Sequence, residues 1–201
     1  MLILVRHGES TGNAAGLLAG RVEVPLTERG RGQARSVGRS LHGVTRMIAS
    51  PLGRARATAE ALGLGLPVEI DDRWVEVDYG EYDGRPLGEV PAATWAEWRA
   101  DPHFRPPGGE TLAEVGARVR EACGELFAVD GAGARGAGDV VVVSHVSPIK
   151  AATCWALGLP DEGAWRLYLA TASVTRIAHG PGGIVLHAFN DTPWTGGPTV
   201  R

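Results

Sequence analysis

The sequence predicts an α/β fold, specifically a three-layer α/β/α sandwich with a mostly parallel central sheet and helices on both faces. Short apolar runs alternate along the chain with segments whose apolar residues recur at helical spacing. The runs at 2–5 and 140–143 are apolar at every position, which is typical of parallel strands covered on both faces. A length of 201 residues favours one domain, here residues 1–201.

The elements follow in order from local signals. Strand 2–5 ends in a glycine-bearing turn, Thr27 is expected to cap a helix to about residue 40, and Pro51 is expected in the first turn of the next helix. The other expected elements are strands 45–49, 68–70 and 140–143, helices 111–127 and 147–157, and a hairpin of 173–178 with 184–189.

Two segments lack such periodicity. Residues 71–109 carry acidic residues, a Pro-Pro-Gly-Gly stretch and several aromatic side chains, so we expect an insertion that acts as a substrate lid. Its aromatic residues are expected in either the lid or the core: Trp74, Tyr79, Tyr82, Trp95 and Trp98. Residues 131–138 are rich in Gly and Ala and are expected to form a flexible connector.

Composition excludes several classes of protein. The apolar share is 44%, the charged share is 21% and the net charge is -3, so neither nucleic acid nor a membrane is an expected partner. No apolar run approaches the roughly 20 residues that cross a bilayer, and the chain starts without a signal-peptide pattern, so a cytoplasmic location is expected. Cys123 and Cys154 lack the spacing of a zinc site or disulfide framework and are expected to be reduced core thiols.

Two histidines mark a candidate site. His7 and His145 each directly follow an apolar strand, and ligands of parallel sheets bind outside the carboxyl ends of the strands. If the two strands are neighbours, both imidazoles enter the same crevice, with Arg6 beside the first. Four other histidines lack this placement and are expected to be structural or to lie on the surface: His42, His103, His179 and His187.

Four blocks carry a family resemblance: Arg6-His7-Gly8-Glu9-Ser10, Ser50-Pro51-Leu52-Gly53-Arg54-Ala55, Glu76-Val77-Asp78-Tyr79-Gly80 and Ser144-His145. In order and spacing the chain resembles the histidine phosphatase superfamily, the phosphoglycerate mutase-like proteins, and Pro107-Gly108-Gly109-Glu110-Thr111 resembles that family's Gly-Gly-Glu segment. The resemblance implies the phosphoglycerate mutase-like fold. The sequence departs from the family at Val146, where the family usually has glycine, so less space is expected beside the phosphate.

The resemblance also implies roles for single residues. His7 would be the nucleophile, Glu76 the proton donor, and His145 a second phosphate-binding imidazole. The arginines Arg6 and Arg54 would clamp the phosphate, and the phosphate-binding set is completed by Asn13, Ser10 and the backbone N–H of Val146. These roles agree with physical chemistry, because planar guanidinium groups match phosphoryl oxygens and nearby positive charge keeps an imidazole neutral.

Other readings of the residues remain open. Gly8-Glu9-Ser10-Thr11-Gly12 fits the elbow of a serine esterase, but Ser10 is expected to lie too near the N-terminus for an upstream strand to supply the second oxyanion donor. A cofactor-dependent phosphoglycerate mutase is the rival within the family, and a non-catalytic phosphate-binding module is the rival outside enzymes. No P-loop pattern is present.

The preferred prediction is a hydrolase of small phosphomonoesters that works through phosphohistidine on His7 without a metal or organic cofactor. Its partner is a small phosphorylated metabolite, and a homodimer is plausible. The sequence leaves the substrate open among sugar phosphates, phosphoglycerates, α-ribazole phosphate or a broad range.

Overall fold

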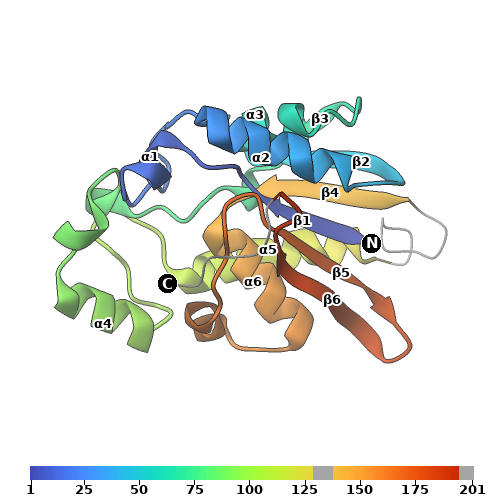
Figure 1. Ribbon diagram of the computed structural model, residues 1–201. Coiled ribbons are helices and arrows are strands. Elements are labelled where there is room, and N and C mark those ends of the chain that lie inside the picture. The colour runs from blue at the N-terminus through green and yellow to red at the C-terminus, as the bar shows by residue number, and fades with distance from the viewer. Residues whose placement is uncertain (129–137, 195–201) are drawn as a thin grey trace.

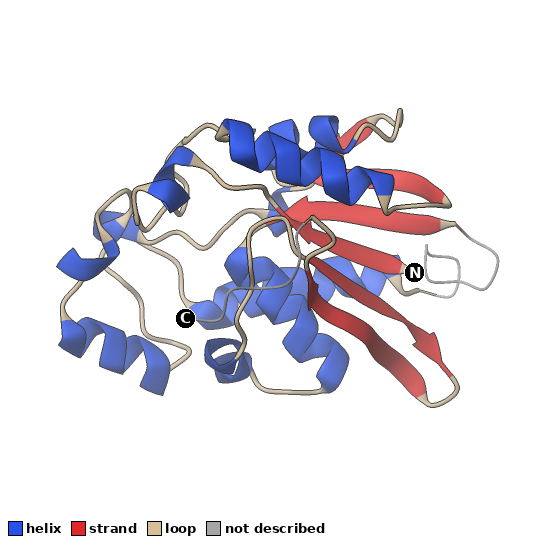
Figure 2. Ribbon diagram, in the orientation of Figure 1, coloured by secondary structure: helices blue, strands red, loops and turns tan. Residues whose placement is uncertain are grey.

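Six strands form one sheet in the order β3-β2-β4-β1-β5-β6 in the computed structural model, which describes residues 1–128 and 138–194. The strands are β1 (Leu2–Arg6), β2 (Val44–Ala49), β3 (Val68–Ile70), β4 (Asp139–Ser144), β5 (Val174–Gly180) and β6 (Gly183–Asp191). The α-helices are α1 (Thr11–Ala14), α2 (Glu28–Arg39), α3 (Gly53–Leu62), α4 (Ala92–Ala100), α5 (Leu112–Leu126) and α6 (Val146–Leu157). The expected α/β sandwich is confirmed (Figure 2).

The register between β1 and β4 decides where the site lies. The two strands pair in parallel, and Arg6 stands opposite Ser144. β2 and β3 continue the parallel part of the sheet, whereas β5 runs antiparallel to β1 and forms the expected hairpin with β6. Residues 7 and 145 therefore leave the same edge of the sheet side by side.

Helices cover both faces of the sheet (Figure 1). Alternate residues of one strand belong to two separate cores: Leu2 and Leu4 pack with α5 and α6, whereas Ile3 and Val5 pack with α2 and α3. β4 divides its valines in the same way. This explains why both strands are apolar at every position.

The helix ends follow the expected capping signals with small shifts. The Thr27 hydroxyl accepts the N–H of Gly30 and caps α2, and Thr111 forms a reciprocal capping box with Glu114 at the start of α5. Pro51, expected in the first turn of its helix, lies before it, because Leu52 is the N-cap of α3. Arg54 is still in the first turn.

Residues 71–109 contain more structure than their pattern predicts. The segment forms α4 and three short 3-10 turns: η1 (Asp72–Trp74), η2 (Gly80–Tyr82) and η3 (Leu87–Glu89). Trp74 and Trp98 are buried, so part of the aromatic set is core. A fourth 3-10 segment, η4 (Asp161–Arg166), follows α6. The expected connector 131–138 lies, apart from Gly138, outside the described residues.

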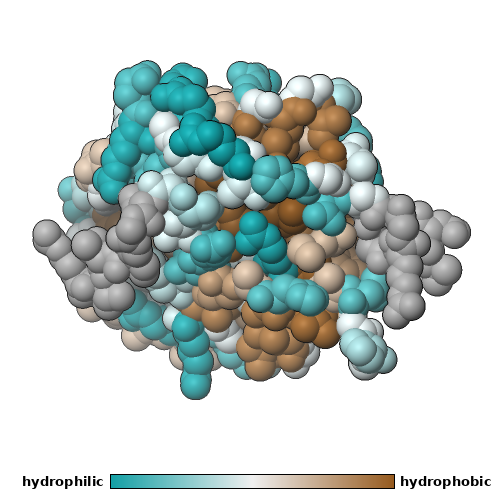
Figure 3. Space-filling model, turned by 45° about the vertical axis from the view of Figure 1, so that its right-hand side comes forward, coloured by the Kyte–Doolittle hydropathy of each residue, from teal (hydrophilic) through white to brown (hydrophobic). Residues whose placement is uncertain are grey.

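Both cysteines lie in the core, and the surface mixes polar and apolar residues. Cys123 and Cys154 are free and buried, and burial raises the pKa of their thiols to about 12 and about 11. Hydrophobic areas alternate with hydrophilic residues on the face shown in Figure 3. Among residues 1–128 and 138–194, no helix combines the length and apolarity that a membrane span requires.

Close backbone packing between α2 and α3 generates a stability prediction. A Cβ added at Gly38 would collide with the carbonyl oxygen of Leu62, so Gly38→Ala should lower the free energy of unfolding by about 1–3 kcal/mol despite alanine's better helix propensity. Gly124 on α5 has no neighbour near the added Cβ, and Gly124→Ala should raise that free energy by about 0.5–1 kcal/mol. Urea unfolding measures both, and equal signs would contradict the packing argument.

Candidate active site

His7 lies buried at the end of β1, and its ring is held in one tautomer. Its backbone N–H donates to Ser144 O at 2.9 Å, which continues the β1–β4 pairing by one residue. Its Nδ1 lies 2.7 Å from the carbonyl oxygen of Gly8. A carbonyl only accepts, so Nδ1 carries the proton, and a neutral ring then keeps a lone pair on Nε2. This is the form that a nucleophilic imidazole needs.

His145 leaves β4 beside it and is fully buried. The centroids of the His7 and His145 rings are 5.1 Å apart, with the ring planes at 57°. The Nε2 atom of His145 is 2.7 Å from the hydroxyl of Ser50 at the end of β2. Its Nδ1 is buried and has no hydrogen-bond partner among the described residues.

Arg54 is brought to the same edge by the first turn of α3. Only 1% of Arg54 is exposed, and its guanidinium donates to three carbonyl oxygens of the segment that follows α1: Ala19 at 3.1 Å, Gly20 at 2.5 Å and Val22 at 3.0 Å. Its backbone carbonyl accepts from Thr58, whose hydroxyl accepts the N–H of Gly8 at 3.1 Å. Arg54 and the turn after His7 are thus one hydrogen-bonded unit.

Arg6 completes the cationic pair. One of its terminal nitrogens donates to Leu169 O at 2.6 Å, in the segment that leads to β5. The Nε atoms of Arg6 and Arg54 are both buried without a partner among the described residues. Together with Nδ1 of His145, three buried nitrogens at this edge have unused hydrogen-bonding capacity, which suits an anion with several oxygens.

The electrostatics of the edge disfavour the protonated form of both imidazoles. Burial, followed by the charges of Arg6 and Arg54, lowers the pKa of His7 well below its ordinary value. Burial is also the main cause that lowers the pKa of His145, followed by Arg54, His7 and Arg6. Desolvation and nearby positive charge both disfavour an imidazolium ion.

Asn13 and Ser10 lie close to this edge but bind mainly each other. Ser10 is the N-cap of α1, and its hydroxyl both donates to Asn13 Oδ1 at 3.0 Å and accepts the Asn13 N–H at 3.2 Å. The side-chain nitrogen of Asn13 has no partner among the described residues. Contact of either residue with phosphate therefore stays a prediction.

Glu76 binds the start of α6. Oε1 of its carboxylate accepts the N–H groups of Val77 at 2.8 Å and Ser147 at 3.1 Å, and Oε2 accepts that of Val146 at 3.1 Å. Glu76 is 4% exposed, and a helix N-terminus is a favourable place for a carboxylate. The N–H of Val146, expected to contact phosphate, is used here by Glu76, so that contact also stays a prediction.

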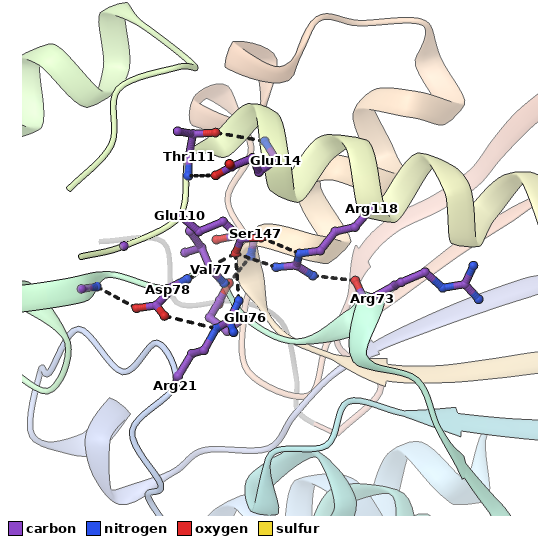
Figure 4. Close-up of polar contacts among 12 residues, drawn as sticks. Arg21, Arg73, Glu76, Val77, Asp78, Glu110, Thr111, Glu114, Arg118 and Ser147 are labelled. Carbon is purple, nitrogen blue, oxygen red and sulfur yellow. Dashed lines mark hydrogen bonds and ion pairs between the residues drawn. The ribbon is translucent and has the colours of Figure 1, made fainter. Parts of the chain in front are cut away.

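A second carboxylate fixes the loop that carries Glu76 (Figure 4). Arg118 on α5 donates to Glu110 at 2.8 and 3.1 Å and to the carbonyl of Arg73 at 2.6 Å. Glu110 exchanges backbone and side-chain hydrogen bonds with Asp78, and Arg21 binds Glu110 at 3.3 Å. The chain is thus held on both sides of Glu76.

Most predicted site residues therefore meet at one edge, and others were not anticipated. The sequence did not indicate four supporting residues: Ser50, Thr58, Glu110 and Arg118. Signals existed for Ser50, which stands in a matched block, and for Glu110, which stands in the Gly-Gly-Glu segment. Thr58 and Arg118 gave no signal, because they act through contacts that form only in the folded chain. Among the described residues, no group of three or more His, Cys, Asp and Glu gathers as a metal site.

Comparison with known proteins agrees with this geometry. The family model described as "Histidine phosphatase superfamily (branch 1)" matches residues 2–192. A protein of Erwinia tasmaniensis named "Probable phosphoglycerate mutase GpmB" is 34% identical over 184 residues, which cover 88% of this chain and 83% of that protein.

Solved structures show the same likeness. A mycobacterial glucosyl-3-phosphoglycerate phosphatase in complex with VO3 superposes with a TM-score of 0.83 at 31% identity, covering 94% of this chain and 98% of that one. A phosphoserine phosphatase from Entamoeba histolytica shares the fold, with a TM-score of 0.85 at 24% identity over 96% and 98% of the two chains. The family model over residues 2–192 and the relative at 34% identity show that the chain belongs to the histidine phosphatase superfamily.

Proposed function

We propose that the protein is a phosphatase that hydrolyses small phosphomonoesters through a phosphohistidine on His7, with Glu76 as the proton donor. The observation that carries this proposal is the fixed tautomer of His7. Because Nδ1–H donates to the Gly8 carbonyl, Nε2 of the neutral ring keeps its lone pair for attack on phosphorus. In a metal-independent mechanism, Arg6, Arg54 and His145 supply the positive charge and donors that the phosphoryl oxygens need.

The chemistry proceeds in two steps. In the first, Nε2 of His7 forms a bond to phosphorus while the ester P–O bond breaks, and the proton of Glu76 passes to the leaving oxygen. In the second, water attacks phosphorus, Glu76 takes a proton from that water, and the N–P bond breaks. The products are the alcohol and inorganic phosphate, and the enzyme returns to its starting state.

A phosphoglycerate mutase is the second candidate, because relatives such as the Erwinia tasmaniensis protein carry that name. A mutase must bind a ligand with two anionic ends while the ligand reorients. Several cations of segment 71–109 are already engaged: Arg73 pairs with Asp71, Glu121 and Glu125, Arg105 pairs with Glu114, and Arg99 lies over Trp95 and Trp165. These three arginines are therefore not free to hold the second phosphate of a mutase ligand, which supports hydrolysis over mutase activity.

Removal of the His7 imidazole tests the proposed nucleophile. His7→Ala should abolish release of inorganic phosphate from p-nitrophenyl phosphate and glycerol phosphate in the presence of EDTA, because no phosphohistidine forms. His103→Ala removes an exposed histidine outside the site and should keep the wild-type rate. Near-normal activity of the His7 variant would refute the mechanism, and isomerisation of phosphoglycerate faster than phosphate release would favour the mutase.

The second prediction concerns the proton. Glu76→Gln keeps an oxygen for the N–H groups of Val77 and Ser147 but cannot transfer a proton. Its kcat should fall by about 10² or more for glycerol phosphate and much less for p-nitrophenyl phosphate, since a nitrophenolate leaves without protonation. Glu81→Gln, at an exposed carboxylate of the same segment, is the control. Equal losses on both esters would mean that Glu76 only supports the local structure.

The third prediction concerns ionisation. Because burial and the two arginines lower the pKa of His7, the folded protein should keep His7 neutral as the pH falls through about 6.5, where a model imidazole gains its proton. Proton NMR of the imidazole, assigned by the signal lost in His7→Ala, should show its titration step only at lower pH. A step at the ordinary value would contradict the neutral nucleophile.

A further inference from the structure

A cavity of about 190 Å³ lies beside Glu76, and neither the two histidines nor Arg6 and Arg54 line it. Val77, Val146 and Ser147, whose N–H groups bind the Glu76 carboxylate, also line this cavity. The proton donor must stand next to the leaving oxygen of the ester. A cavity at this position is therefore a candidate place for the organic part of the substrate.

The walls of the cavity are largely aromatic. Trp95 and Trp98 of α4 stack with ring centroids 5.5 Å apart, and Trp165 of η4 meets them edge-on at 6.2 and 6.3 Å. Tyr79 meets Trp98 edge-on at 5.5 Å. Leu18, Leu87 and Leu112 contribute further apolar lining. Such a wall favours a flat apolar group and penalises a polyhydroxylated one, whose hydroxyls would lose water without gaining partners.

The cavity wall contains one charged side chain, Lys150 of α6. Among the described residues no ion pair or hydrogen bond engages its ammonium group. Burial lowers the pKa of Lys150, in keeping with its place in the wall. An ammonium group without a partner matches a carboxylate on the ligand.

We propose that the substrate is a phosphomonoester whose alcohol carries a flat, mostly apolar ring with one carboxylate, the ring held between the aromatic residues and the carboxylate bound by Lys150. The size agrees, because an apolar cavity of about 150 Å³ accepts benzene. This inference rests on the proposed phosphatase function and narrows it to a substrate class that differs from sugar phosphates and phosphoglycerates.

The test compares four esters of primary or secondary aliphatic alcohols, so that leaving-group reactivity is similar: glycerol phosphate, phosphoglycerate, benzyl phosphate and para-carboxybenzyl phosphate. We expect kcat/KM for benzyl phosphate to exceed that for glycerol phosphate by roughly ten- to a hundredfold, the gain from burying one ring. The para-carboxyl group should add about tenfold more through its charged hydrogen bond.

Variants assign each gain to its residue. Trp95→Ala should reduce the ratio of benzyl to glycerol phosphate, and Lys150→Met should remove the advantage of para-carboxybenzyl over benzyl phosphate, while Lys150→Arg retains it. Leu157→Ala, an exposed leucine of α6 outside the cavity, should change neither ratio. Each ratio is measured on one preparation, so a loss of folded enzyme cancels from it.

The outcomes separate the two proposals. Hydrolysis that depends on His7 but shows equal kcat/KM for glycerol and benzyl phosphate would overturn the substrate class and leave the phosphatase intact. A preference for phosphoglycerate over both benzyl esters would overturn it as well. Absence of His7-dependent phosphate release from all four esters would overturn the phosphatase and this inference together.

Discussion

The parallel pairing of β1 with β4 is the constraint on which the site depends. Because Arg6 stands opposite Ser144, the next residue of each strand is a histidine, and the two rings lie 5.1 Å apart at the carboxyl edge of the sheet. A shift by one residue would turn one imidazole towards a hydrophobic core. The alternate packing of Leu4 and Val5 into opposite cores opposes that shift, so core packing and catalytic geometry are set by the same register.

Glu76 lies in a loop, outside every strand of the sheet, yet its position is fixed by contacts with other segments. Its carboxylate binds the first N–H groups of α6, and the backbone on either side is held by Glu110 and Arg118. These contacts join three segments far apart in the sequence. Helix α6, which follows the second histidine, therefore fixes the position of the carboxylate that is proposed as the proton donor.

The sequence predicted the strands, the long helices and the residues that meet at the sheet edge, because those signals are local or shared with the family. It located both histidines from apolar runs that end in them, whereas α4 was missed because its segment mixes polar and aromatic residues without a clear apolar face. The residues that support the site were not predicted for a different reason. Thr58 and Arg118 are ordinary helix residues until the fold brings Gly8 and Glu110 to them.

Val146, where the family usually has glycine, contributes to the site in two ways, through its backbone and through its side chain. A valine at the first position of α6 keeps its backbone N–H, and that N–H binds Glu76. Its side chain adds to the apolar wall of the cavity. In the proposed mechanism, Arg6, Arg54 and His145 would stabilise the phosphoryl oxygens, while the start of α6 would hold the proton donor. The valine side chain therefore alters the apolar space beside the site and leaves the hydrogen bond to Glu76 unchanged.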